Sequence, residues 1–211
     1  MIMKPYDTEL SKKEEVRAMF DNIAPAYDRL NHTLSLSVDR IWRRRVVRIV
    51  GRLHPRRVLD MATGTGDLAV MMARSIPEAH IKGVDLSEGM LDVARRKVTA
   101  RGLDGRGDLG RGLAELSRAL RPGGRIVILE FSTPTMPVFG RLYDWYSHRV
   151  LPRIGGWLSH DRQAYDYLPR SVDEFPQPEE FLTILAAAGF RDCRARSQSF
   201  GIAQIYTAEK C

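Results

Sequence analysis

Cysteine and long apolar runs are scarce in this sequence, and each shortage excludes a class of protein. Only two cysteines occur among the 211 residues, Cys193 and Cys211, so a disulfide-stapled domain is excluded and a reducing compartment fits. No apolar run approaches the roughly 20 residues that a membrane-spanning helix needs, and residues 1–16 lack the apolar centre of a signal peptide. We therefore expect a cytoplasmic protein that at most lies at the inner face of a membrane.

The chain is basic rather than acidic. Lysine and arginine total 33 against 26 aspartates and glutamates, which gives a formal net charge of +7 at pH 7. This charge favours acidic partners such as phosphates, nucleic acid or an anionic membrane surface, although a merely solvated basic face explains it equally well. With 44% hydrophobic residues, the chain is long enough to bury the core of one domain.

The first 50 residues have the pattern of a helical cap. Ser11 and Glu14 form a capping box that begins one helix, and Pro25 is expected to break it. A second helix is predicted over 39–50, with apolar residues on one face and arginines on the other. The apolar face consists of Ile41, Trp42, Val46 and Ile49, with Trp42 in the core, and the basic face consists of Arg43, Arg44, Arg45 and Arg48.

From residue 57 onward strand and helix patterns alternate, which predicts an α/β fold with a parallel sheet and helices on both faces. Strands are predicted over 58–63, 81–87 and 125–132, and helices over 67–76, 87–102, 112–124 and 179–190. The tail is expected to form an antiparallel hairpin that turns near Gly201. We expect one domain with four parts: a cap (1–50), a core (57–132), a middle segment rich in proline and aromatic residues (133–178) and a C-terminal helix and hairpin (179–211).

A glycine turn joins the first of these strands to the helix after it. Gly64, Thr65 and Gly66 let the backbone approach a ligand, and the helix that follows points its first N–H groups at the same place. The stretch GTGDLA also fits the dinucleotide pattern G-x-G-x-x-G/A, with Asp85 about 20 residues on. A turn that only reverses the chain is the simpler alternative.

Two carboxylates favour one ligand over the other. Asp60 precedes the turn, where its negative charge repels a pyrophosphate and attracts a cationic ligand. Asp85 ends the second strand, where a carboxylate can accept hydrogen bonds from both hydroxyls of a ribose. S-adenosylmethionine has a ribose, a cationic sulfonium and no phosphate, so the sequence favours it over a nicotinamide dinucleotide. No metal site is predicted.

Two separated signatures carry a family resemblance. The stretch YDRLNHTLS (27–35), with Asp39 and Trp42 after it, and the stretch RALRPGGR (118–125), continuing through LEFS (129–132), resemble the ubiquinone/menaquinone-biosynthesis C-methyltransferases. Segments 143–156, 164–176 and 186–190 are similar in order and spacing. The resemblance implies the seven-stranded class I methyltransferase sheet and methyl transfer from S-adenosylmethionine to a ring carbon of a polyprenylated demethylquinol, from a menaquinol or ubiquinol precursor. The cofactor residues that we expect are Tyr27, Asp60, Gly64, Thr65, Gly66, Asp85 and Leu86.

Other functions remain open at this stage. The basic charge permits an S-adenosylmethionine-dependent RNA methyltransferase or another small-molecule methyltransferase, although no RNA-binding module is visible. A non-catalytic S-adenosylmethionine-binding protein is a further alternative. For the proton of the quinol, the candidate bases are His148, Asp144, Tyr146 and Asp161, and none stands out alone. Because a prenylated substrate lies in a bilayer, the arginine face of the second helix is expected to contact a membrane.

One interval departs from the family. Where relatives have two strands before the 112–124 helix, this chain has only the nine residues Leu103–Arg111, too few for two strands of about 5–6 residues each. We infer that two strands are missing near 103–110, with the break near Arg106–Gly107. Residues omitted from the sequence would explain this, and would make +7 an overstatement of the charge, whereas a true deletion predicts a rebuilt sheet without activity. The second missing strand would pair with both strand 58–63 and strand 125–132, so its absence leaves both without a neighbour.

Overall fold

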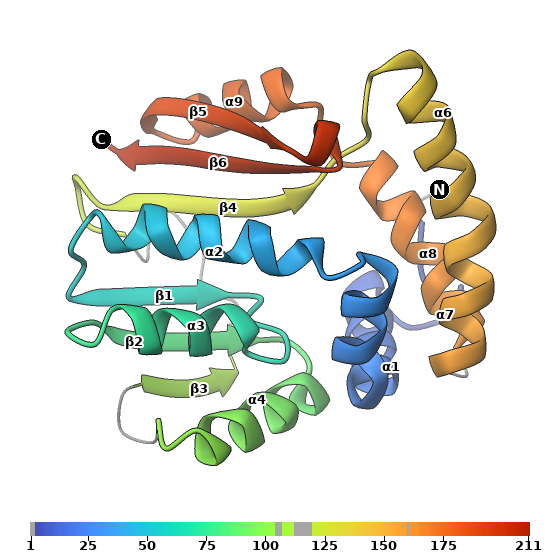
Figure 1. Cartoon of the computed structure of the whole chain (residues 1–211), viewed down its shortest axis with the longest axis horizontal. Coiled ribbons are helices and arrows are strands. Elements are labelled where there is room, and N and C mark those ends of the chain that lie inside the picture. The colour runs from blue at the N-terminus through green and yellow to red at the C-terminus, as the bar shows by residue number, and fades with distance from the viewer. Residues whose placement is uncertain (1–2, 104–106, 112–119, 160) are drawn as a thin grey trace. The chain divides into compact units, whose positions relative to one another are not determined.

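The computed structural model describes residues 3–103, 107–111, 120–159 and 161–211 (Figure 1). The chain divides into two compact units. Unit 1 contains Met1–Leu113 and Gly155–Ala164, and unit 2 contains Ala114–Ile154 and Tyr165–Cys211.

Unit 1 contains a parallel sheet in the order β1-β2-β3. Its strands are β1 (Arg57–Met61), β2 (His80–Asp85) and β3 (Gly107–Arg111), and α3 (Asp67–Ser75) and α4 (Glu88–Ala100) connect them. The side chain of Ser87 caps α4 by accepting a hydrogen bond from the backbone of Met90 at 3.0 Å. The alternation of strands and helices predicted from residue 57 to residue 102 is therefore confirmed.

Two further helices precede this sheet. The first, α1 (Lys12–Leu34), begins at the predicted capping box of Ser11 and Glu14. It continues through Pro25, so the prediction that Pro25 ends the helix is wrong. An internal proline costs about 3 kcal/mol, and burial of Met19, Ile23 and Leu30 on the same helix offsets this cost.

The second helix, α2 (Val38–Gly51), lies where the sequence predicts it. Trp42 and Val46 are buried, as expected, but Ile41 is exposed, which corrects the predicted apolar face. Val47 and Val50 are buried in its place, so the buried stripe runs through positions 42, 46, 47 and 50. This spacing is typical of a helix packed along one face.

Unit 2 contains an antiparallel sheet in the order β4-β6-β5. The strands are β4 (Arg125–Phe131), β5 (Phe190–Gln198) and β6 (Ala203–Lys210), and the turn between β5 and β6 contains η2 (Ser199–Gly201), so the predicted hairpin is confirmed. Helix α9 (Pro178–Ala187) packs against this sheet. The core of unit 2 consists of Ile126, Leu185, Phe190, Tyr206 and Ala208.

The middle segment is mostly helical. It forms α6 (Pro137–Trp145), the π-helical turn η1 (Tyr146–Val150), α7 (Leu151–Ser159) and α8 (Arg162–Asp173), which includes Pro169.

The short interval near residue 107 has a visible structural consequence. The described residues of this interval form one strand, β3, so the expectation that two strands are missing there is corrected to one: nine residues have room for a five-residue strand but not for a second. Among the described strands, β1 pairs only with β2 and β4 pairs only with β6. These are the two strands that the sequence predicts to lack a neighbour. Arg106, at the predicted break, and most of the predicted 112–124 helix lie outside the described residues.

Candidate active site

The glycine turn follows β1 in unit 1. Gly64 and Gly66 have φ angles of +56° and +76°, which side chains disfavour. A Cβ atom on Gly66 would lie 2.8 Å from the Cβ of Ala94 on α4, whereas one on Gly64 would meet nothing within 4 Å. Gly66 is therefore required for packing, and Gly64 leaves open space at the turn.

Asp85 joins the ends of β1 and β2. Its Oδ2 accepts a hydrogen bond from the backbone N–H of Gly64 at 2.8 Å, and its Oδ1 accepts one from that of Ser87 at 2.9 Å. The carboxylate is buried. A carboxylate can accept about four hydrogen bonds, so the two bonds from the described residues leave acceptor positions for a ligand's hydroxyl groups.

Asp60 lies beneath the turn at the end of β1. Its Oδ2 accepts a hydrogen bond from the hydroxyl of Thr63 at 2.7 Å. Burial, and to a smaller extent the charge of Asp85, raises the pKa of Asp60 from 3.8 to about 6. Two nearby buried carboxylates thus repel each other at the turn, and a positively charged ligand relieves that repulsion.

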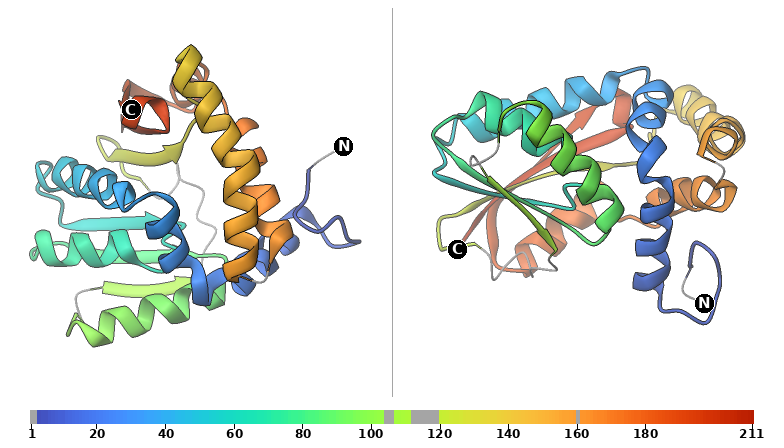
Figure 2. Two further views of the ribbon diagram at one scale, coloured as in Figure 1. Left: turned by 45° about the vertical axis from the view of Figure 1, so that its right-hand side comes forward. Right: turned by 90° about the horizontal axis from the view of Figure 1, so that it is seen from below.

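Helix α1 crosses the end of the unit 1 sheet where β1 and β2 finish (Figure 2). Asp21 on α1 accepts hydrogen bonds from the hydroxyl of Ser87 at 2.6 Å and from the N–H of Gly89 at 2.9 Å. Burial raises the pKa of the Tyr27 phenol, which also lies on α1 and hydrogen-bonds to Asn31. Leu86 follows β2 directly and is half-buried. The predicted cofactor residues Tyr27, Asp60, Gly64, Thr65, Gly66, Asp85 and Leu86 therefore all belong to unit 1.

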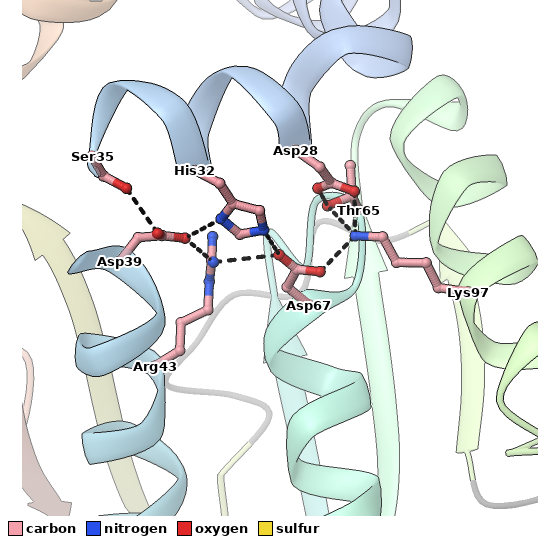
Figure 3. Close-up of polar contacts among 8 residues, drawn as sticks. All are labelled: Asp28, His32, Ser35, Asp39, Arg43, Thr65, Asp67 and Lys97. Carbon is pink, nitrogen blue, oxygen red and sulfur yellow. Dashed lines mark hydrogen bonds and ion pairs between the residues drawn. The ribbon is translucent and has the colours of Figure 1, made fainter. Parts of the chain in front are cut away.

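A second set of contacts fixes the hydroxyl of Thr65 (Figure 3). Thr65 Oγ1 donates to Asp28 Oδ1 at 2.5 Å and accepts from Lys97 Nζ at 3.0 Å. Lys97 also contacts Asp28 Oδ2 at 2.6 Å. These bonds connect α1, the glycine turn and α4, and they commit the proton of the Thr65 hydroxyl to Asp28.

Asp67, the first residue of α3, connects this set to α2. One of its carboxylate oxygens contacts Lys97 at 2.6 Å, and the other lies 3.3 Å from Arg43 and 3.6 Å from His32 Nε2. The opposite ring nitrogen of His32, Nδ1, contacts Asp39 at 2.9 Å, and Asp39 also accepts a hydrogen bond from Ser35 and pairs with Arg43 (Figure 3). We call this set of residues the cap network: Asp28, His32, Ser35, Asp39, Arg43, Thr65, Asp67 and Lys97.

Sequence reasoning missed most of the cap network. Only Thr65 was predicted as a site residue, and Arg43 was assigned to a basic face. Arg43 instead turns inward to Asp39 and Asp67, which corrects that assignment. Two signals were available: the signature YDRLNHTLS, with Asp39 after it, contains four members of the network, and Asp67 is an acid placed directly after the glycine turn at the start of a helix.

The four candidate bases have different surroundings. Both carboxylate oxygens of Asp161 are engaged, by the phenol of Tyr6 at 2.5 Å and by the N–H of Ala164 at 3.0 Å, so Asp161 caps α8. Burial raises the pKa of Tyr146, which keeps its phenol protonated near neutral pH and unsuited to act as a base.

His148 and Asp144 lie together in unit 2. The two ring nitrogens of His148 each lie 3.1 Å from a carboxylate oxygen, one of Asp144 and one of Asp173. Both ring nitrogens of His148 are therefore in contact with carboxylates of the same unit. His148 thus joins α6 and η1 to α8.

The pKa of Asp60 makes a testable prediction about stability. The folded state binds this proton more tightly than the unfolded chain, so the free energy of unfolding should fall as pH rises from 3.8 to about 6. Across this pH range, we expect the free energy of unfolding of the wild type to fall by on the order of 2–3 kcal/mol relative to that of Asp60→Asn. Urea unfolding of both proteins at several pH values measures the difference, and identical pH slopes would contradict the assignment.

Comparisons with known proteins identify the family of the chain. The model of the ubiE/COQ5 methyltransferase family matches residues 8–106 and 100–210, in two pieces that meet at the short interval. A demethylmenaquinone methyltransferase of Bacteroides fragilis is 39% identical and covers 99% of this chain and 97% of its own length. The Geobacter sulfurreducens "ubiquinone/menaquinone biosynthesis C-methyltransferase UbiE" is 46% identical over 94% of this chain and 90% of its own length. The Bacteroides alignment spans 238 positions, more than this chain contains, so that relative has residues that this chain lacks.

Solved structures show the same fold. A Nostoc punctiforme protein described as a putative O-methyltransferase aligns with a TM-score of 0.59 at 17% identity, over 90% of this chain and 60% of that one. The S-adenosylmethionine-dependent methyltransferase SibL aligns with a TM-score of 0.52 at 18% identity, over 74% of this chain and 50% of that one. The fold is thus that of the class I methyltransferases, with the C-terminal hairpin that the sequence predicts. From its near full-length matches, the chain belongs to the ubiE/COQ5 methyltransferase family, whose members are S-adenosylmethionine-dependent enzymes.

Proposed function

We propose that this chain methylates a ring carbon of a polyprenylated demethylquinol, with demethylmenaquinol as the first candidate. Relatives from Bacteroides fragilis and Thermus thermophilus are named demethylmenaquinone methyltransferases. The name of the Geobacter sulfurreducens relative includes ubiquinone as well, so a ubiquinol precursor is the second candidate substrate. The comparisons do not favour RNA as a substrate.

The observation that carries this proposal is the contact of Asp85 with Gly64 and Ser87. It brings a buried carboxylate, open space at a glycine and the N-terminus of α3 to one edge of the unit 1 sheet. Ligands of open α/β sheets bind at this edge, outside the carboxyl ends of the strands. The arrangement fits a ribose at Asp85 and a cationic group near Asp60.

S-adenosylmethionine, when bound, supplies an electrophilic methyl group on a sulfonium. The residues of this chain that we propose to hold it are Tyr27, Asp60, Gly64, Thr65, Gly66, Asp85 and Leu86. Asp85 would accept the ribose hydroxyls, and Gly64 would let the backbone approach the ligand. The charges of Asp60 and Asp85 would favour the sulfonium form, because an effective dielectric below that of water strengthens their attraction. Helix α1 would keep water away from this edge of the sheet.

Contact with a membrane belongs to the proposal because a prenyl chain keeps the substrate in lipid. In the described part of the chain, no helix is long and apolar enough to cross a membrane. We therefore propose that the protein is cytoplasmic and reaches its lipid-embedded substrate from the inner face of the membrane. The arginine face predicted on α2 loses Arg43 to the cap network, while Arg44, Arg45 and Arg48 remain exposed.

A labelled-methyl assay tests the function. The protein is incubated with S-adenosylmethionine carrying a labelled methyl group and with demethylmenaquinol, a demethylated ubiquinol precursor, RNA or no acceptor. We expect label in the quinol alone. We also expect Asp85→Asn to lower kcat/KM at least about tenfold, mostly through the KM of the donor, because a charged hydrogen-bond acceptor is lost. Label in RNA would contradict the proposal, and donor binding without transfer would assign a non-catalytic binding protein instead.

Three glycine substitutions separate ligand contact from backbone strain. Gly64→Ala and Gly102→Ala both place a methyl group at positive φ with nothing within 4 Å, so each should cost about 1–2 kcal/mol of stability. Only Gly64→Ala should also weaken binding of S-adenosylhomocysteine, measured by calorimetry. Gly66→Ala should cost more stability than either, because its methyl group meets Ala94. Equal binding by Gly64→Ala and Gly102→Ala would remove Gly64 from the site.

A further inference from the structure

Helix α6 is apolar yet has no buried residue. Its sequence, PVFGRLYDW, contains Val138, Phe139, Leu142, Tyr143 and Trp145, and the helix buries none of its residues. A helix in a globular unit usually covers its apolar side chains with a neighbouring element. The exposed apolar side chains of α6 therefore indicate a surface that binds another molecule.

One side of α6 is already packed. The ring of Phe139 lies 5.2 Å from that of Phe200, and a Cβ atom on Gly140 would lie 2.7 Å from the carbonyl oxygen of Pro134. The inner side of the helix therefore rests against the backbone and an aromatic side chain of its own unit, and this contact fixes which side remains open.

The opposite side carries an exposed apolar stripe. Val138, Leu142 and Trp145 follow one another at helical spacings of four and three residues, which places them on one face. Their exposed fractions are 85%, 60% and 57%. We call these three residues the α6 stripe.

Basic side chains accompany the α6 stripe. Arg141 lies on α6, Arg149 on η1 and Arg153 on α7, and all three are exposed. Arg153 donates a hydrogen bond to the carbonyl of Arg149 at 2.9 Å, which holds its side chain along the helix. Exposed valine, leucine and tryptophan beside arginine is the composition of helices that lie in the interface of an anionic bilayer.

We infer that the α6 stripe and its arginines dock this protein on an anionic lipid surface. The inference extends the proposed function, because a prenylated quinol is reached from lipid, but vesicle binding itself needs no methyl transfer. A second copy of the chain fits the stripe less well, since a two-fold contact would bring the same arginines against each other. Headgroup phosphates instead complement Arg141, Arg149 and Arg153.

The inference also distinguishes α6 from α2. Helix α2 exposes Arg44 and Arg48, but its apolar residues are buried apart from Ile41, at 46% exposure, and the half-buried Val38 and Ile49. Arginine alone gives only a salt-sensitive attraction to a membrane, whereas buried apolar side chains add a contribution that salt does not screen. The α6 surface offers both contributions.

Flotation with vesicles of equimolar phosphatidylglycerol and phosphatidylcholine tests the inference with matched variants. We expect Val138→Ser/Leu142→Ser to lower vesicle binding at least about tenfold, in proportion to the apolar area lost, and the control Ile41→Ser to leave it unchanged. We expect Arg141→Glu/Arg149→Glu to lower binding at least about tenfold, at roughly 1 kcal/mol per charge, with little change for Arg44→Glu/Arg48→Glu. Binding that depends on the α2 residues alone would overturn the inference.

A second readout does not depend on how well these variants fold. In a Trp157→Phe protein, Trp145 is the exposed tryptophan, and Trp42 is buried. We expect vesicles that contain brominated lipid to quench Trp145 and to shift its emission to shorter wavelength. Absence of quenching would overturn the inference. It would also be overturned if the stripe variants kept vesicle binding but lost a dimer formed by the wild type. Methyl transfer to a short-chain, water-soluble demethylquinol would continue in either case, so a failure here is distinguishable from a failure of the proposed function.

Discussion

The carboxylate of Asp85 links the two loops that follow β1 and β2, and the proposed ligand site depends on this link. Strands β1 and β2 are paired along their length, but the loops that follow them diverge into separate helices. Asp85 accepts one hydrogen bond from the backbone N–H of Gly64 in the first loop and one from that of Ser87 in the second. Asp60 lies nearby at the end of β1, so two buried carboxyl groups meet at this edge of the sheet, and the raised pKa of Asp60 shows that a second negative charge is costly there. A methyl donor with a sulfonium suits that field, and a pyrophosphate does not.

The cap network adds a second constraint to the same edge. Asp28, Asp39 and Asp67 form ion pairs with Arg43 and Lys97, and His32 lies between Asp39 and Asp67 (Figure 3). Such partly buried pairs are retained only when nearly every donor and acceptor has a partner. The network therefore fixes α1 and α2 against the glycine turn and the start of α3. It also fixes the hydroxyl of Thr65, which donates to Asp28 and accepts from Lys97.

Local patterns predicted much of this structure, and long-range pairing explains what they missed. The capping box at Ser11, the alternation of strands and helices, the C-terminal hairpin and the placement of Asp60 and Asp85 follow from periodicity and spacing. Pro25 was misjudged because tertiary packing of α1 outweighs the local cost. Lys97 and Thr65 are 32 residues apart in the sequence, and no periodicity connects them. That β1 and β4 each lack a neighbour among the described strands was predicted, because the interval before residue 112 is too short for the central strand of the family.

We propose that charge, rather than shape, selects the ligand at the glycine turn. Calorimetry with S-adenosylmethionine and S-adenosylhomocysteine tests it most directly, because the two ligands share every group except the methyl group and the positive charge on sulfur. We expect Asp60→Asn to weaken binding of the sulfonium ligand more than binding of the neutral thioether. Equal losses for both ligands, or no loss for either, would contradict it.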